Sequence, residues 1–193
     1  MTKPMISRES FAARLWRRTL DGVGVQLGLA WVGVLVFFAV FAPFFANSMP
    51  LLMSKNGTLS APVLRYLSVE DVWVLATFFI ALALYSLKLA NGRKWLLFFT
   101  LSAIAAVLAN LSVKPPVLVI YEDFRSADYT QVDWRLMPPI PYAPSDYLRD
   151  LGSPGLEAPF ASSGHSHWMG TEENGADVFS RMIHACRIAL SIG

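Results

Sequence analysis

Long runs of apolar positions dominate the first 113 residues of this chain. No charged residue occurs between Asp21 and Lys55, and two further uncharged runs cover residues 72–87 and 95–113. A helix needs about 20 apolar residues to cross the hydrocarbon core of a bilayer. The pattern therefore predicts three transmembrane helices, at 22–46, 71–90 and 95–113, of which the second has the shortest uncharged run.

A cleaved signal peptide is the alternative interpretation of the first run. The apolar part of a signal peptide is about 7–15 residues long, and this run is longer. The letters "FFANS" that follow it are only a weak imitation of a cleavage site. Composition also disfavours a soluble domain, since 16% of the residues are charged and 54% are hydrophobic, against about 25% charged in soluble domains.

The basic residues predict how the three spans are oriented. They crowd the segment before the first span and the turn between the second and third (Lys3, Arg8, Arg14, Arg17, Arg18, Lys88, Arg93, Lys94). By the positive-inside rule, residues 1–21 and the turn at 91–94 are cytoplasmic, and residues 47–70 and 114–175 are extracytoplasmic. Residues 1–21 fit either a basic amphipathic helix on the membrane surface or a plain positive flank.

The polar segments carry signals for turns and for extended chain. Asn56-Gly57 and nearby prolines mark turns in 47–70, and Pro115-Pro116 ends the third span. Residues 117–121 fit a short strand, and the proline- and aromatic-rich stretch at 122–166 fits an extended segment laid across another surface. Residues 176–193 show a helical apolar stripe with Arg181, His184 and Arg187 on the other face.

The expected fold class is therefore an all-α membrane protein. It has three transmembrane helices, an extended extracytoplasmic segment and a C-terminal amphipathic helix. Asp177 is expected in the first turn of that last helix, where a carboxylate favours the positive end of the helix dipole. Arg181, four residues later, is expected to pair with it.

No catalytic, cofactor-binding or metal-binding residue stands out. His165 and His167, with Glu172 and Glu173 nearby, offer metal-ligand types, but a loop with two histidines lacks the third ligand of a catalytic zinc site. An ordinary polar loop is the favoured interpretation, with a membrane-anchored metal enzyme as a weak alternative. The segment 114–173 holds four basic and nine acidic residues, which disfavours nucleic-acid binding. The single cysteine, Cys186, leaves no intrachain disulfide.

The stretch "HWMGTEENGADVFSRMIHACRIALSIG", residues 167–193, carries a resemblance to a known family. It resembles the H-P-L-G-T-D-x-x-G-R-D-V-x-S-R signature of dipeptide/oligopeptide ABC-transporter permeases, specifically the C-type subunit. The matching residues are His167, Gly170, Thr171, Gly175, Asp177, Val178, Ser180, Arg181, Ile183, Arg187 and Gly193. Glu172 stands in place of the usual aspartate, Ala176 of arginine, and Ala185 of a common glycine. The upstream "PPIPYAPSDY" is also similar to the approach to that signature.

The resemblance implies a transport subunit without enzyme activity of its own. It implies a bacterial inner-membrane location with a cytoplasmic N-terminus. The implied partners are a second permease subunit, two ATPase subunits and an extracytoplasmic solute-binding protein. Residues 176–193 are then the start of a transport core, and the chain is expected to be the N-terminal part of a permease, with a hairpin that the family usually lacks. The signature residues His167, Gly170, Thr171, Glu172, Gly175, Asp177, Ser180, Arg181 and Arg187 are given a structural or coupling role. The alternative is a stand-alone three-span protein whose outer segment binds or regulates a partner.

Overall fold

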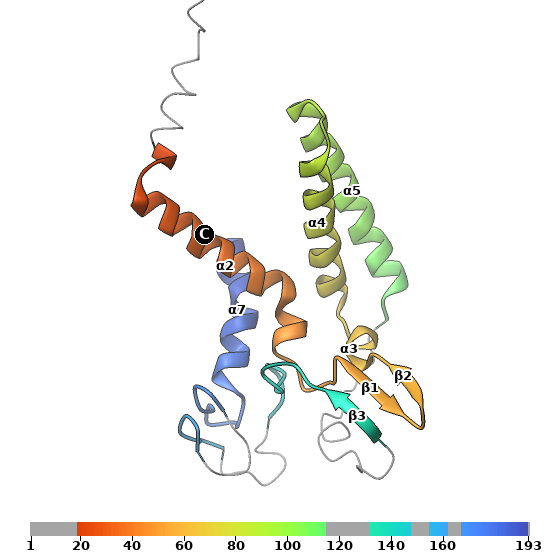
Figure 1. Cartoon of the computed structure of the whole chain (residues 1–193), viewed down its shortest axis with the longest axis vertical. Helices are drawn as coiled ribbons and strands as arrows, with labels where there is room; N and C mark the ends of the chain where they lie inside the picture. Colours follow the sequence, from red (N-terminus) through yellow and green to blue (C-terminus); the bar gives the residue numbers. More distant parts are fainter. Residues whose placement is uncertain (1–18, 115–131, 148–154, 162–166, 193) are drawn as a thin grey trace, which may run out of the picture.

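Three long apolar helices dominate the fold (Figure 1). The computed structural model describes residues 19–114, 132–147, 155–161 and 167–192. The helices are α2 (Val23–Phe45), α4 (Val69–Ser86) and α5 (Asn91–Ser112), and each is long and apolar enough to cross a membrane. The prediction of three such helices is confirmed, and they indicate a multi-pass membrane protein.

The turn between α4 and α5 lies earlier than the sequence predicts. Since α4 ends at Ser86 and α5 begins at Asn91, the connection is residues 87–90, and residues 91–94 form the first turn of α5. The prediction places Arg93 and Lys94 outside the span because they are charged. Long basic side chains at a helix end, however, can extend toward the interface while their backbone stays helical.

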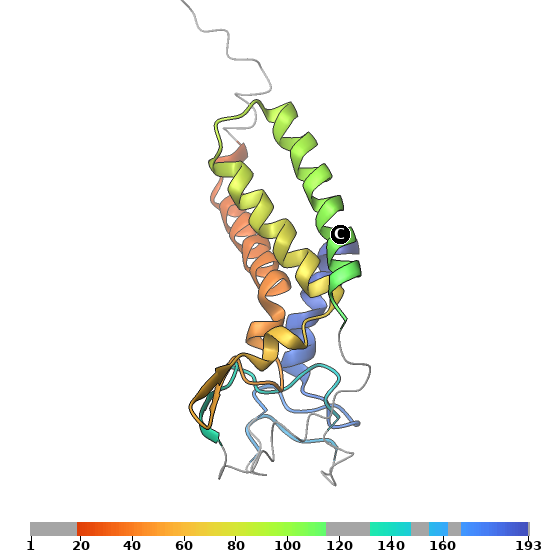
Figure 2. The ribbon, with the colours of Figure 1, turned by 90° about the vertical axis from the view of Figure 1, so that its right-hand side faces the viewer.

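Helices α4 and α5 form an antiparallel hairpin, and the two views show them side by side (Figures 1 and 2). The indole Nε1 of Trp73 on α4 donates to Ser102 on α5, with 3.2 Å to the carbonyl oxygen and 3.2 Å to Oγ. The hydroxyls of Thr77 and Ser102 are 3.0 Å apart. Helices in a bilayer gain nothing from hiding apolar surface from lipid, so such interhelical hydrogen bonds contribute to holding them together.

The expectation of an all-α protein is confirmed only in part: the fold is mostly helical, but the polar segments form a small sheet. Its strands are β1 (Leu52–Lys55), β2 (Thr58–Ser60) and β3 (Val132–Leu136), all antiparallel, in the order β2-β1-β3. Asn56 and Gly57 join β1 to β2 with φ of 52° and 73°, which is the backbone that a two-residue hairpin turn requires. The turn predicted from this dipeptide is confirmed.

Strand β3 attaches the segment after α5 to the loop between α2 and α4. The carboxylate of Asp133 accepts from the hydroxyl of Ser54 at 2.9 Å and from the backbone N–H of Gly57 at 3.0 Å. These two hydrogen bonds lower the pKa of Asp133, which is exposed. Both polar segments therefore lie at the same end of the helices, opposite the α4–α5 turn (Figure 1).

After β3 the chain remains extended and follows the end of α2. The backbone amide of Ile140 donates to Phe45 O at 3.0 Å, and that of Asn47 donates to Ile140 O at 3.1 Å. The hydroxyl of Ser48 accepts from the amide of Ala143 at 2.8 Å and donates to the carboxylate of Asp146. Over residues 132–147 the expected extended segment is thus present, and the surface it covers is the chain's own α2–α4 loop.

A short helix, α3 (Pro62–Arg65), precedes α4, and the last helix, α7 (Val178–Ile192), packs on the sheet end of α2. The main buried apolar cluster lies where α2, the extended segment and α7 meet. It contains Ala42, Ala46, Ile140, Tyr142 and Ile183, with Phe38, Phe45 and Phe179 packed against it. The predicted strand at 117–121 and residues 1–18 of the basic N-terminal segment lie outside the described residues.

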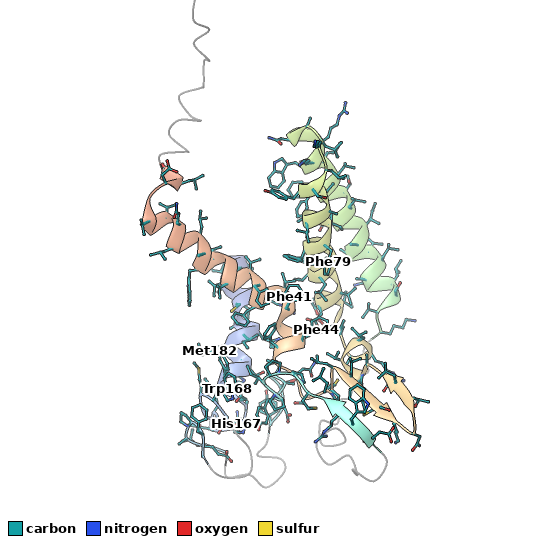
Figure 3. All side chains as sticks on the ribbon, in the orientation of Figure 1. Phe41, Phe44, Phe79, His167, Trp168 and Met182 are labelled. Atoms are coloured by element: carbon teal, nitrogen blue, oxygen red, sulfur yellow. The ribbon has the colours of Figure 1, made fainter. Side chains whose placement is uncertain are left out.

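Helix α7 turns its more polar face inward. Ser180 and Ile183 are buried and His184 and Arg187 are half-buried, and these four residues follow one helical stripe. Met182 points outward from α7 (Figure 3), and Ile188 is also exposed. An apolar exterior over a polar interior is the arrangement expected of a helix that meets lipid.

Candidate functional site

The residues before α7 form a closed turn. The amide of Glu172 donates to Ala176 O at 2.9 Å, and the amide of Gly175 donates back to Glu172 O at 2.8 Å. Thr171 and Asp177 form an antiparallel bridge across the turn. The turn leads directly into α7. Ala176, which stands where the resembled signature has arginine, is fully buried within this turn.

Two glycines of the signature are required by the backbone of this turn. Gly170 and Gly175 have φ of 74° and 78°, a region that side-chain-bearing residues rarely adopt. At Gly170 a Cβ atom would also overlap the carbonyl oxygen of Glu157. The close approach of residues 157–159 to this turn therefore depends on the absence of a side chain.

Thr171 binds the neighbouring segment 155–161. Its hydroxyl accepts from the amide of Glu157 at 2.7 Å and donates to Gly155 O at 2.5 Å. In the reverse direction, the amide of Thr171 donates to Glu157 O at 3.0 Å. One threonine side chain thus satisfies two backbone groups that would otherwise be buried without partners.

Asp177 caps α7 and binds His167. Its Oδ1 accepts from the backbone N–H of Ser180 at 2.6 Å, which is the hydrogen bond of a helix N-cap. Its Oδ2 lies 2.8 Å from Nδ1 of His167, and the exposed fraction of both side chains is 1%. The ring of Tyr142 covers the imidazole with 4.2 Å between centroids, and Glu157 Oε2 lies 3.9 Å from Nε2.

Three expectations about this region are corrected. Asp177 precedes α7 rather than lying in its first turn, and it pairs with His167 rather than with Arg181. His167 belongs to a buried hydrogen-bonded cluster and not to an ordinary polar loop. Its partner is ten residues away in the sequence, so the H-x-H spacing gives no sign of it.

Arg181 binds the extended segment instead. Its Nη1 donates to the carboxylate of Glu172, its Nε donates to Pro144 O at 3.1 Å, and its guanidinium lies 5.8 Å from the ring centroid of Tyr147. The side chains of Arg181 and Glu172 are 34% and 43% exposed, so this ion pair contributes about 0.2–1 kcal/mol. Its main effect is to fix the extended segment against α7.

Arg187 connects α7 to two of the membrane helices. Its Nε donates to Ala39 O in α2 at 2.6 Å, and its Nη1 donates to Asp71 Oδ1 in α4 at 2.5 Å. Pro43 lies four residues after Ala39 within α2. Because proline has no N–H, the carbonyl of Ala39 lacks its helical donor, and Arg187 supplies one. Asp71 is itself fixed by a capping box with Ser68 at the start of α4.

His184 makes a second contact with α2. Its Nε2 lies 3.0 Å from Ala46 O. Ala46 is the C-cap residue of α2, so its carbonyl has no later helical N–H to accept from. Side chains on one face of α7 therefore bind two α2 carbonyls that lack a helical partner. We call the assembly of the turn 170–177, the buried His167 and the inner face of α7 the α7 junction.

All nine signature residues lie in or beside the α7 junction, and all contribute to it through side-chain contacts, backbone hydrogen bonds, backbone conformation or burial. Sequence reasoning missed the residues that complete it, which are Ala39, Pro43, Asp71, Tyr142, Glu157 and Ala46. Pro43 is the only one with a usable signal, because a proline inside an uncharged helix leaves a carbonyl to be satisfied elsewhere.

The contacts of the junction hold α7 to α2, to α4 and to the extended segment. His165 lies outside the described residues, and within them no group of three His, Cys, Asp or Glu side chains is arranged to hold a metal ion. The chain matches no family model, no curated protein and no solved structure.

Proposed function

We propose that this chain is the N-terminal part of a permease subunit of an ATP-binding-cassette importer in a bacterial inner membrane. Its cargo would be peptides or related small solutes. The subunit would not hydrolyse ATP itself. Its partners would be two ATPase subunits, a second permease subunit and an extracytoplasmic solute-binding protein.

One observation carries the proposal. The residues that resemble the permease signature are spread from 167 to 187, and they converge on the α7 junction, where they connect α7 to α2 and α4. A sequence match scattered over a surface would carry little weight. Here the matching residues fix one helix, α7, in place. This supports the proposal that α7 begins a transport core.

The physical role of the junction follows from its contacts. Arg187 and His184 fix α7 to the second half of α2, and Arg181 fixes it to the extended segment. In the proposed transporter, movement of α7 would therefore be transmitted to both. The sheet and the extended segment form the polar end of the molecule, where a solute-binding protein would dock on the extracytoplasmic side.

Uptake in cells tests the proposal. We expect disruption of the gene encoding this chain to abolish accumulation of a labelled tripeptide, and the wild-type gene to restore it. Arg187→Met should fail to restore uptake although the protein reaches the membrane in normal amount. Arg65→Gln, which removes an exposed arginine at the end of α3, is the matched control and should restore it.

Association tests the partners separately. A tagged copy purified in mild detergent should retain two ATPase subunits and a second permease, and adjacent reading frames should encode them. Unchanged uptake after disruption, together with stable purification free of ATPase subunits, would refute the permease and establish the stand-alone three-span protein.

A further inference from the structure

An open cleft of about 440 Å³ lies between α4 and α5, at the end that carries their turn. Its walls combine apolar side chains with interfacial aromatic and polar ones (Leu84, Tyr85, Asn91, Lys94, Trp95 and Phe98). Tyr85 is 83% and Trp95 62% exposed. Both are residue types that concentrate where hydrocarbon meets headgroups, so the cleft spans the boundary between the two.

The charged side chains around this cleft, among the residues that the structure describes, are all basic. Lys88, Arg93 and Lys94 lie in or beside the turn, and the sequence holds no acidic residue between Asp71 and Glu122. Among the described residues none of the three cations forms an ion pair. Lys94 Nζ donates at 3.3 Å to Tyr85 O, which is a neutral partner.

The start of α5 adds to the same field. Its first turn contains no acidic side chain, and no side chain caps it. The positive end of the helix dipole is therefore left facing the same region. Cations above an apolar wall are complementary to a molecule with an anionic head and a hydrocarbon tail.

We infer that this cleft binds an anionic phospholipid. The phosphate would lie among Arg93, Lys94 and Lys88, and an acyl chain would lie along Leu84 and Phe98 between the helices. The volume falls within the range of about 300–1,000 Å³ that is usual for small-ligand pockets. The inference does not depend on the proposed transport function.

Native mass spectrometry of the full chain, released from detergent, tests the inference with phosphatidylglycerol and phosphatidylcholine of the same chain length. We expect a phosphatidylglycerol adduct that survives at activation energies which remove phosphatidylcholine. Arg93→Gln with Lys94→Gln should weaken phosphatidylglycerol binding by about 30-fold, from the attraction of two cations near an anionic surface.

Lys55→Gln with Arg65→Gln is the matched control, because it removes one lysine and one arginine at the opposite end. It should leave binding unchanged. If both double variants lost the same affinity for phosphatidylglycerol, the attraction would be diffuse. If phosphatidylglycerol and phosphatidylcholine bound equally well, the cleft would be only an apolar groove. Either result overturns the inference, as does equal binding of glycerol phosphate without acyl chains.

A second measurement locates the lipid. Phosphatidylglycerol with brominated chains should quench the fluorescence of the wild type more than that of Trp95→Phe, because Trp95 lines the cleft beside the inferred acyl chain. Equal loss of fluorescence in both proteins would place the lipid elsewhere.

Discussion

Replacing Arg187 by methionine tests the α7 junction most directly, because methionine keeps the unbranched stem and removes the donors. Two partners are left behind. The carbonyl of Ala39 loses its donor, at about 1–3 kcal/mol for a buried orphan group. Asp71 loses its cation but keeps its bond to the amide of Ser68.

The expected loss of unfolding free energy depends on how exposed the Arg187–Asp71 ion pair is. The side chains of Arg187 and Asp71 are 22% and 12% exposed. An exposed pair contributes about 0.2–1 kcal/mol, whereas breaking a fully buried one costs about 3–5 kcal/mol. We expect Arg187→Met to lower the free energy of unfolding by about 3 kcal/mol. Asp71→Ala should lower it by a similar amount because it also removes the carboxylate that accepts from the amide of Ser68 in the α4 capping box, a hydrogen bond worth about 1 kcal/mol.

The assay is reversible unfolding in mixed detergent micelles, followed by circular dichroism. In a double-mutant cycle the two substitutions should show a coupling of about 1–2 kcal/mol, as contacting residues do. Arg65→Gln is the control and should change the free energy by less than about 0.5 kcal/mol. Additive effects of Arg187→Met and Asp71→Ala would refute the contact.

Pro43→Ala provides an independent check on the freed carbonyl. Alanine at position 43 restores the N–H that Ala39 O lacks. The change that Pro43→Ala makes in the free energy of unfolding should therefore be about 1 kcal/mol more stabilising in the Arg187→Met protein than in the wild type. An equal effect in both backgrounds would show that Arg187 does not replace the helical donor.

Three further predictions concern other parts of the fold. Gly170→Ala should destabilise the chain by about 1–3 kcal/mol because of its positive φ and the crowding carbonyl. Gly33→Ala is the control, because Gly33 has open space around it, and it should not destabilise the chain. Thermal unfolding distinguishes the two variants. Ser102→Ala should weaken the α4–α5 hairpin by about 0.6–1.7 kcal/mol, whereas Thr100→Ala removes bonds only within α5 and should cost less in the same assay. Because the pKa of Asp133 is lowered in the fold, the hydrogen bonds that bind β3 to the hairpin turn should persist down to the ordinary aspartate pKa of about 4 and be lost only below it. The NMR shift of the Gly57 amide should titrate with a midpoint below that ordinary value, and the titration should vanish in Asp133→Asn.

The helices could be predicted from the sequence because their signal is local. The uncharged runs at 22–54 and 95–113 are longer than about 18 residues and indicate membrane spans by themselves. The run at 72–87 is shorter and gives the weakest signal of the three, whereas the Asn56-Gly57 dipeptide defines its own turn. Strand β3 is different, because it is recognisable only from its pairing with β1. Asp133 bonds to Ser54 across a separation of 79 residues, and no window of sequence contains both.

The inward orientation of the polar face of α7 also escapes a local reading. An amphipathic pattern shows which residues share a face, but the solvent decides which face is buried. In water the stripe with Met182 would point inward, whereas beside lipid the side with His184 and Arg187 does. The two partners of Arg187 are separated from it by 148 and 116 residues. The sequence therefore identifies residues of the junction but does not predict the contacts between them.

The bond between Arg187 and Ala39 has a consequence for how the protein is made. Ribosomes add about 5–20 residues per second, and 148 residues separate the two partners. For about 7–30 s after Ala39 is synthesised, its carbonyl therefore lacks the donor that Arg187 supplies in the finished fold. We expect water or an insertion factor to bind at this end of α2 until α7 is made. A nascent chain arrested before Arg187 should be cross-linked there, and the completed chain should not.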